Sequence, residues 1–219
     1  GLIMMHRRNI LKSSLATIFG VSIGTTQAGL LYRPQCGTKC SHNGNKYSMG
    51  GPDKWGGVNT VDGHTHLQYY IDNRDRDLSA DIWDAEIAKA YEGWAAVTNL
   101  SFERIDNGKN ADILMGVSGR WRHGFGRRGD TLAWAFLPTK REFDGQLWTM
   151  FDKAEKWTID PEERGILFRA VCAHEIGHLL GLHHSEHESA LMFPYYRPHI
   201  DTPQLVDDIP RVQVLYGVK

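Results

Sequence analysis

The stretch that decides the fold lies late in the chain and reads His174-Glu175-Ile176-Gly177-His178-Leu179-Leu180-Gly181-Leu182-His183-His184. Residues four positions apart lie on one face of an α-helix, so His174 and His178 direct their rings at a common point. Gly181 has no Cβ and can adopt a positive φ, which predicts that the helix ends there and the chain turns back. The turn would bring His184 to the same point.

Three converging histidines indicate a catalytic zinc site. A catalytic zinc keeps three protein ligands and one water, whereas a structural zinc is closed by four protein ligands. We therefore predict His174, His178 and His184 as the ligands of one Zn²⁺. Glu175 is the predicted general base that takes the proton of the water. The alternative, a helix that happens to carry histidines, does not explain why a glutamate and a helix-ending glycine stand in register with them.

The composition is that of a globular protein. The chain has 219 residues, of which 41% are hydrophobic and 23% are charged, and its formal net charge is −1. This length allows one domain with a sizeable core. A net charge near zero gives no reason to expect nucleic acid or an anionic membrane as a partner. The cysteines, Cys36, Cys40 and Cys172, do not form the framework of a disulfide-rich protein.

Residues 1–28 are typical of an export signal. Basic residues within 5–12 precede a short apolar run at 15–23, and the segment ends on the small residue Ala28. The run is too short to span a bilayer, which requires about 20 apolar residues. Arg7-Arg8 resembles the twin-arginine motif of prokaryotic signals, and an ordinary secretory signal is the alternative. We expect a secreted, periplasmic or cell-surface protein with no stable membrane insertion after signal removal.

The remaining chain predicts an α+β domain over residues 64–219, after a short irregular segment at 29–63. Apolar residues at steps of three and four predict a helix over 79–98. Asp160 and Pro161 are typical of a helix start, so we expect the histidine-bearing helix to run from Asp160 to about Leu180. Alternating apolar residues predict strands at about 67–71, 101–105, 111–117, 131–136 and 148–151.

Residues beyond the histidines resemble the matrixins, the metzincin family that includes the matrix metalloproteases. The stretch 174–184 fits the metzincin signature. Ser185 follows the third histidine as it does in matrixins, and 190–196 is similar to the family's Met-turn, with Met192 beneath the zinc. Residues 207–217 resemble the family's last helix. The resemblance implies a catalytic domain without a haemopexin-like domain, and the twin-arginine-like signal implies a prokaryotic source.

The family implies a zincin-like α+β fold, in which a twisted five-stranded mixed sheet carries three helices. It also implies a monomeric metalloendopeptidase that acts on protein or peptide substrates. A zinc-binding module without turnover is one alternative, but it would lack Glu175. Another metzincin branch is the closer alternative, and Ser185 together with the Met-turn argues against it.

The resemblance also places the substrate. It would lie antiparallel to an edge strand at Leu132-Ala133-Trp134-Ala135, where backbone hydrogen bonds hold it. Pro194 and Tyr196 would form the wall of the S1′ pocket. Ala170, four residues before the first histidine, takes the pocket-floor position. Its small side chain predicts a deep pocket that prefers Leu, Met or an aromatic residue at P1′.

The structural zinc of matrixins is not expected here. The family binds it with three histidines and an aspartate in the loops around the edge strand. Only His123 remains in this chain, and the other positions hold Phe125, Trp134 and Met150. We therefore predict one zinc ion per chain.

A calcium site is less fully matched. Asp152 and Glu155 correspond to two carboxylate ligands of a family calcium site. The third position is Gly126, although Asp130 could substitute for it. A Ca²⁺ ion and a solvated or salt-bridged pair of acids are both compatible with this pattern.

Pro34-Gln35-Cys36-Gly37 resembles the P-R-C-G segment of matrixin pro-domains. In the family, the cysteine thiolate takes the open zinc position and keeps the enzyme latent. A thiolate is a good zinc ligand that would displace the water. The family arginine is Gln35 in this chain. A disulfide between Cys36 and Cys40, natural after export, is the alternative to a latency switch.

Overall fold

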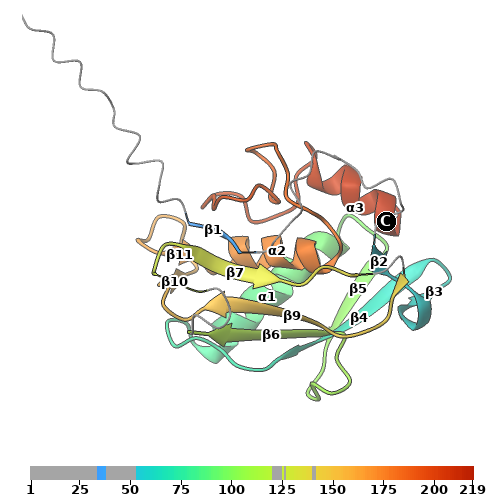
Figure 1. Cartoon of the computed structure of the whole chain (residues 1–219), viewed down its shortest axis with the longest axis horizontal. Coiled ribbons are helices and arrows are strands. Elements are labelled where there is room, and N and C mark those ends of the chain that lie inside the picture. Colours follow the sequence, from blue (N-terminus) through green and yellow to red (C-terminus); the bar gives the residue numbers. More distant parts are fainter. Residues whose placement is uncertain (1–33, 38–52, 120–124, 126, 140–141) are drawn as a thin grey trace, which may run out of the picture. The chain divides into compact units, whose positions relative to one another are not determined.

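A mixed sheet backs the helices of this protein (Figure 1). The computed structural model describes residues 34–37, 53–119, 125, 127–139 and 142–219, all within the unit Tyr32–Lys219. The predicted export signal lies outside the described residues. No helix in the described part of the chain is long and apolar enough to cross a membrane. The helices are α1 (Ala80–Ala95), α2 (Phe168–Leu179), α3 (Asp208–Tyr216) and the 3₁₀-helix η2 (Gly57–Asn59).

Five strands form the body of the sheet, as the sequence predicts. The described strands are β1 (Gln35–Cys36), β2 (Lys54–Trp55), β3 (Thr60–Val61), β4 (His64–Ile71), β5 (Leu100–Arg104), β6 (Ile113–Ser118), β7 (Thr131–Ala135), β8 (Glu142–Phe143), β9 (Leu147–Asp152), β10 (Trp157–Thr158) and β11 (Ile166–Leu167). The sheet order is β1-β7-β9-β6-β4-β3, with β5 also on β4. The β4–β5, β4–β6 and β6–β9 pairs are parallel, whereas β7 is antiparallel to β9.

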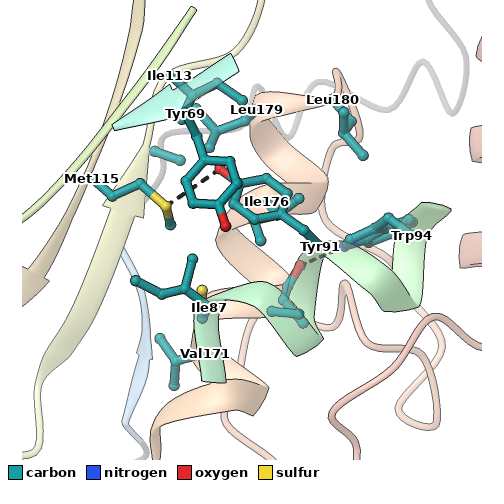
Figure 2. Close-up of a cluster of buried hydrophobic side chains, with 14 of the residues drawn as sticks. Tyr69, Ile87, Tyr91, Trp94, Ile113, Met115, Val171, Ile176, Leu179 and Leu180 are labelled. Carbon is teal, nitrogen blue, oxygen red and sulfur yellow. Dashed lines mark hydrogen bonds between the residues drawn. The ribbon is translucent and has the colours of Figure 1, made fainter. Parts of the chain in front are cut away.

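The stripe predicted on the first helix fills the core. Ser79 caps α1 by accepting a hydrogen bond from the backbone N–H of Ile82. Trp83, Ile87 and Trp94, at helical spacing, are at most 1% exposed. The indole N–H of Trp94 donates to the carbonyl oxygen of Ala173 at 2.9 Å, which joins α1 to α2. Figure 2 shows this layer, where side chains of α1 and α2 meet those of β4 and β6.

The histidine-bearing helix begins later than the sequence predicts. Asp160 does not cap it; instead its carboxylate accepts from the N–H of Glu162 in a local turn. The next residues form β11, which pairs with β10. The helix begins only at Phe168, whose ring stacks on Trp83 with centroids 3.7 Å apart. Tertiary packing therefore overrides the start signal at Asp160.

The segment before residue 64 is also more ordered than predicted. Trp55 of β2 is fully buried, and its indole N–H donates to the carbonyl oxygen of Leu179 at 2.7 Å. Its backbone N–H donates to the hydroxyl of Tyr216, which in turn donates to the carbonyl oxygen of Leu180. Trp55 therefore satisfies the carbonyl of Leu179 at the end of α2 and, through Tyr216, links this end to α3.

Candidate functional site

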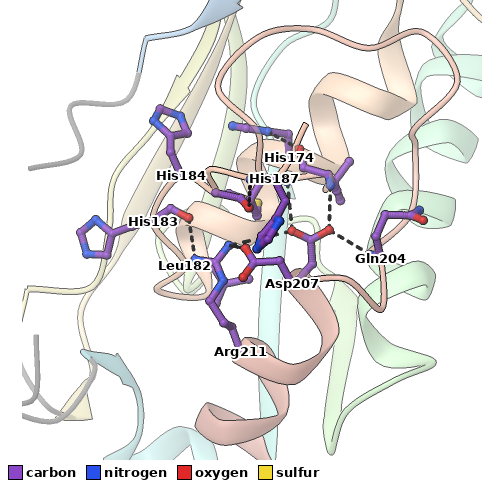
Figure 3. Close-up of polar contacts among 12 residues, drawn as sticks. His174, Leu182, His183, His184, His187, Gln204, Asp207 and Arg211 are labelled. Carbon is purple, nitrogen blue, oxygen red and sulfur yellow. Dashed lines mark hydrogen bonds and ion pairs between the residues drawn. The ribbon is translucent and has the colours of Figure 1, made fainter. Parts of the chain in front are cut away.

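The three histidines of the motif converge. His174 and His178 lie one turn apart on α2. His184 follows the turn after that helix, and Figure 3 shows it with His174. The Nε2 atoms of His174 and His178 are 3.1 Å apart, and those of His178 and His184 are 3.3 Å apart. With the Sγ of Cys36, they form a group of four donor atoms within 4.8 Å of one another. Three imidazoles and a thiol are a donor set that suits zinc.

Backbone carbonyls orient two of the rings. The Nδ1 of His174 lies 2.7 Å from the carbonyl oxygen of Leu191, and the Nδ1 of His178 lies 2.7 Å from that of Leu182. A carbonyl oxygen only accepts, so each Nδ1 carries the proton and each Nε2 presents a lone pair to the centre. Burial lowers the pKa of His174 to about 4 and holds the pKa of His178 well below its ordinary value. Both rings are thus neutral near pH 7, as metal ligands must be.

Gly181 ends the helix in the predicted way. Its φ is +97°, in the left-handed region that favours glycine. The N–H of Leu182 donates to the carbonyl oxygen of Gly177 at 2.9 Å, and the N–H of Gly181 donates to that of His178 at 2.9 Å. These two bonds close a Schellman turn, which directs the chain toward His184.

A second glycine in the motif has a packing role that its pattern does not reveal. Met192 is fully buried under α2. A Cβ at Gly177 would overlap the Sδ of Met192 and would lie 2.9 Å from Cζ2 of Trp94. The carboxylate of Asp208 on α3 accepts from the N–H groups of Leu191 and Met192 at 2.7 and 3.1 Å. Gly177 and Asp208 together hold the methionine against the helix that carries the histidines.

Glu175 is completely buried on α2 and lines the cleft together with His174. The structure therefore brings the predicted base to the same cavity as His174, the first of the predicted metal ligands. The cavity is open to solvent, and its empty space, including solvent at the mouth, is about 370 Å³. Four of the predicted substrate-binding residues line it: Leu132, Ala170, Pro194 and Tyr196. Ile200 and Arg197 also line it, and the sequence analysis missed both of them.

The other two predicted substrate-binding residues, Ala133 and Ala135, are not among the residues that line this cleft. The side chains of Ala133 and Ala135 on β7 are 0% and 4% exposed and belong to the core. The carbonyl oxygen of Ala133, by contrast, accepts a hydrogen bond from Gly37 at 2.7 Å. The backbone of β7 thus binds an extended segment of the chain itself, and its binding of substrate stays a prediction.

The segment 34–37 lies between β7 and the wall of the pocket. Strand β1 pairs with β7 in the parallel direction, and Gln35 also forms a bridge with Tyr195. The Sγ of Cys36 is 3.3 Å from the Nε2 of His178. Four backbone bonds hold the segment: Gln35 N–H to Asp130 O, Gly37 N–H to Ala133 O, Cys36 N–H to Pro194 O, and Tyr196 N–H to Pro34 O. Cys40, the other cysteine of the alternative disulfide, lies outside the described residues.

The two predicted calcium ligands are buried beside each other at the end of β9. Asp152 and Glu155 are 1% and 5% exposed. Glu155 accepts from the N–H of Gly129, and Oδ1 of Asp152 accepts from that of Ala154. Oδ2 of Asp152 has no hydrogen-bond partner among the described residues. Burial raises the pKa of both carboxyls, so the chain's own groups do not fully compensate their charge.

The positions of the family's structural zinc are only partly visible. His123 lies outside the described residues. Phe125 is 3% exposed, and Trp134 on β7 stands opposite Met150 on β9. The absence of a structural zinc stays a prediction.

Comparison with known proteins gives a consistent result. A family profile described as Matrixin matches residues 60–217. The chain is 41% identical to stromelysin-1 of Equus caballus over 161 residues, which cover 70% of this chain and 32% of the relative. It is 40% identical to interstitial collagenase of Sus scrofa over 157 residues, covering 70% and 32%. Against stromelysin-2 of Rattus norvegicus it is 34% identical over 197 residues, covering 87% and 38%. The chain thus spans about a third of the length of these relatives.

Proposed function

The chain belongs to the matrixin family, and we propose that it is a zinc-dependent endopeptidase that hydrolyses peptide bonds within proteins. The observation that carries this proposal is the convergence of three histidine Nε2 atoms beside a buried glutamate. His174, His178 and His184 would hold the zinc, since their Nε2 atoms converge on one point.

The chain's own groups supply the proton transfers and the positioning. When bound, zinc polarises the scissile carbonyl and acidifies a water molecule. The carboxylate of Glu175 takes a proton from the attacking water and returns it to the leaving amine. Burial of Glu175 excludes bulk water from this transfer.

The cleft supports an extended substrate with a large apolar P1′ residue. The backbone of segment 34–37 is hydrogen-bonded on both sides, by β7 and by 194–196, so the groove accepts an extended chain. A substrate would lie antiparallel to β7, opposite in direction to β1. Ala170 is 4% exposed and adds little bulk to the pocket. We infer a preference for Leu, Met or an aromatic side chain at P1′.

Segment 34–37 supports a second part of the proposal, which is latency. The thiol of Cys36 stands among the three histidine nitrogens and would complete a closed four-ligand site. A closed site has no position for the water, and β1 covers the groove that substrate needs. Cys36 is therefore proposed as the residue that keeps the full chain inactive.

Two further expectations are part of this proposal. The buried pair Asp152 and Glu155, with an orphan oxygen on Asp152, supports a Ca²⁺ site. The signal-like residues 1–28 support export from a prokaryotic cell. Proteins or peptides are the expected substrates, and the active form is expected to be a monomer.

Glu175→Ala tests the mechanism. In the full chain carrying Cys36→Ala, which removes the proposed latency, we expect the rate of casein or peptide hydrolysis to fall by about 10²- to 10⁴-fold, the usual contribution of a general acid–base group. Zinc content should stay at one ion per chain, because the histidines are unchanged. Glu162→Gln, an exposed acid in the turn before α2, serves as the matched control and should keep its rate. Hydrolysis that persists in Glu175→Ala would show the mechanism to be wrong.

A further inference from the structure

Arg169 lies in the first turn of α2, directly before Ala170 of the pocket. Its guanidinium joins two carboxylates from different parts of the chain. The Nε and Nη2 atoms lie 2.8 and 2.5 Å from Oδ2 of Asp201, and Nη1 lies 3.2 Å from Oε2 of Glu86 on α1. The Nζ of Lys89 is 2.7 Å from the other oxygen of Glu86, which is 4% exposed. These two acids and two bases form a neutral group, the Arg169 cluster.

The Arg169 cluster fixes a segment that has no regular structure. Residues 197–207 form turns and irregular backbone rather than helix or strand. Directly before this segment in the chain, the hydroxyl of Tyr196 accepts a hydrogen bond from the N–H of Leu167 at 2.8 Å. Toward its end, the N–H of Gln204 donates to Asp208 at 2.9 Å. Asp201 supplies an anchor between them, immediately after Ile200, which lines the pocket.

The two sides of the cluster differ in burial. The side chains of Arg169 and Asp201 are 28% and 26% exposed, whereas that of Glu86 is 5% exposed. Removing the Asp201 carboxylate leaves Arg169 paired with Glu86, so no buried charge loses its partner. Removing the Arg169 guanidinium leaves the buried Glu86 with Lys89 alone, which costs more stability. Both changes release residues 197–207, but we expect loss of the Arg169 guanidinium to lower the free energy of unfolding more than loss of the Asp201 carboxylate.

We propose that Arg169 is a positioning residue that sets P1′ selectivity. By holding Asp201 against α2 and α1, it fixes Ile200 and Arg197 as the far wall of the pocket. The fixed wall admits Leu or Phe and rejects longer side chains. This inference rests on the proposed function, because P1′ selectivity is defined only for a peptidase.

The test compares peptides that differ only at P1′, which is Ala, Leu, Phe or 4-phenylphenylalanine. All variants are made in the full chain carrying Cys36→Ala, so that the proposed latency does not mask hydrolysis. In Asp201→Asn we expect the ratio of kcat/KM for Leu to that for 4-phenylphenylalanine to fall at least fivefold. The change should lie in KM, and kcat for the Ala peptide should stay within twofold. Arg169→Met should show the same fall in this ratio. Arg169→Lys keeps the charge but loses the planar guanidinium with its several N–H donors, so its ratio should be intermediate.

Glu188→Gln is the matched control. Glu188 pairs with Arg197 at 3.5 Å, but its side chain is 75% exposed, so the pair is expected to contribute little. Its P1′ profile should stay within twofold of the parent.

Amide hydrogen exchange separates this inference from the proposed function. In Asp201→Asn, the amides of residues 199–202 should exchange at least tenfold faster than in the parent. Unchanged exchange and an unchanged P1′ profile in a folded Asp201→Asn would overturn the proposal. If the parent cleaves none of the peptides, the proposed function fails, while the exchange rates still decide whether Arg169 fixes the wall.

Discussion

At the residue scale, Gly177 is a position on the histidine-bearing helix where the surrounding packing leaves no space for a side chain. In an ordinary helix, replacing glycine by alanine stabilises by up to about 1 kcal/mol. At Gly177 the added methyl group would overlap Met192 and press on Trp94, and both neighbours are fully buried. Overpacking of this kind costs about 1–3 kcal/mol. We therefore expect Gly177→Ala to lower the free energy of unfolding in urea and to weaken zinc retention.

Gly93→Ala is the matched control for this prediction. Gly93 is also inside a helix, but a Cβ there would meet its nearest atom, Cδ of Pro203, at an ordinary 3.5 Å. This variant should be as stable as the parent or more stable by up to about 1 kcal/mol. Equal stabilisation by both substitutions would mean that Met192 moves freely, contrary to the packing described above.

At the element scale, β1 is the strand that we expect to inhibit peptide hydrolysis, because it covers the groove and carries Cys36. The thiol of Cys36 adds one donor to the histidine group, and four backbone bonds hold the strand in the groove. We expect full-length Cys36→Ala to hydrolyse peptides at least tenfold faster than the parent, although the remaining bonds keep activation incomplete. In the Co²⁺-substituted parent, a thiolate-to-cobalt charge-transfer band should be present. Cys36→Ala should lack the band, and Cys172→Ala, which removes a buried thiol elsewhere, should keep it. Identical spectra and rates in all three proteins would refute latency through Cys36.

The elements that sequence reasoning predicted are those with local causes. The alternation in β4, the stripe of α1 and the turn at Gly181 depend on neighbours in the chain, and the structure confirms them. The start of α2 depends on the stacking of Phe168 on Trp83, which no local signal encodes. The pairing of β1 with β7 joins residues far apart in the chain, so the segment before residue 64 looked irregular. The same holds for the wall residue Ile200, whose position depends on the contact between Arg169 and Asp201.

At the scale of the whole molecule, stability should depend on calcium as well as on zinc. Asp152 and Glu155 lie where β9 ends and where the loop bearing Gly129 is tied down. A cation there would offset the cost of burying two carboxylates. It would bind the folded chain and not the unfolded chain, so it would stabilise the fold. At a Ca²⁺ concentration of 100 times Kd, binding would add about 2.7 kcal/mol, or roughly 5–10 °C in Tm for a domain of this size. We expect this rise in the zinc-loaded protein on adding CaCl₂, measured against MgCl₂ as the control. Asp152→Asn should abolish the rise and leave zinc content unchanged, because the histidine centre is built by other elements. A Tm that is insensitive to Ca²⁺ in the parent would instead show that Asp152 and Glu155 are a buried pair of acids that binds no Ca²⁺.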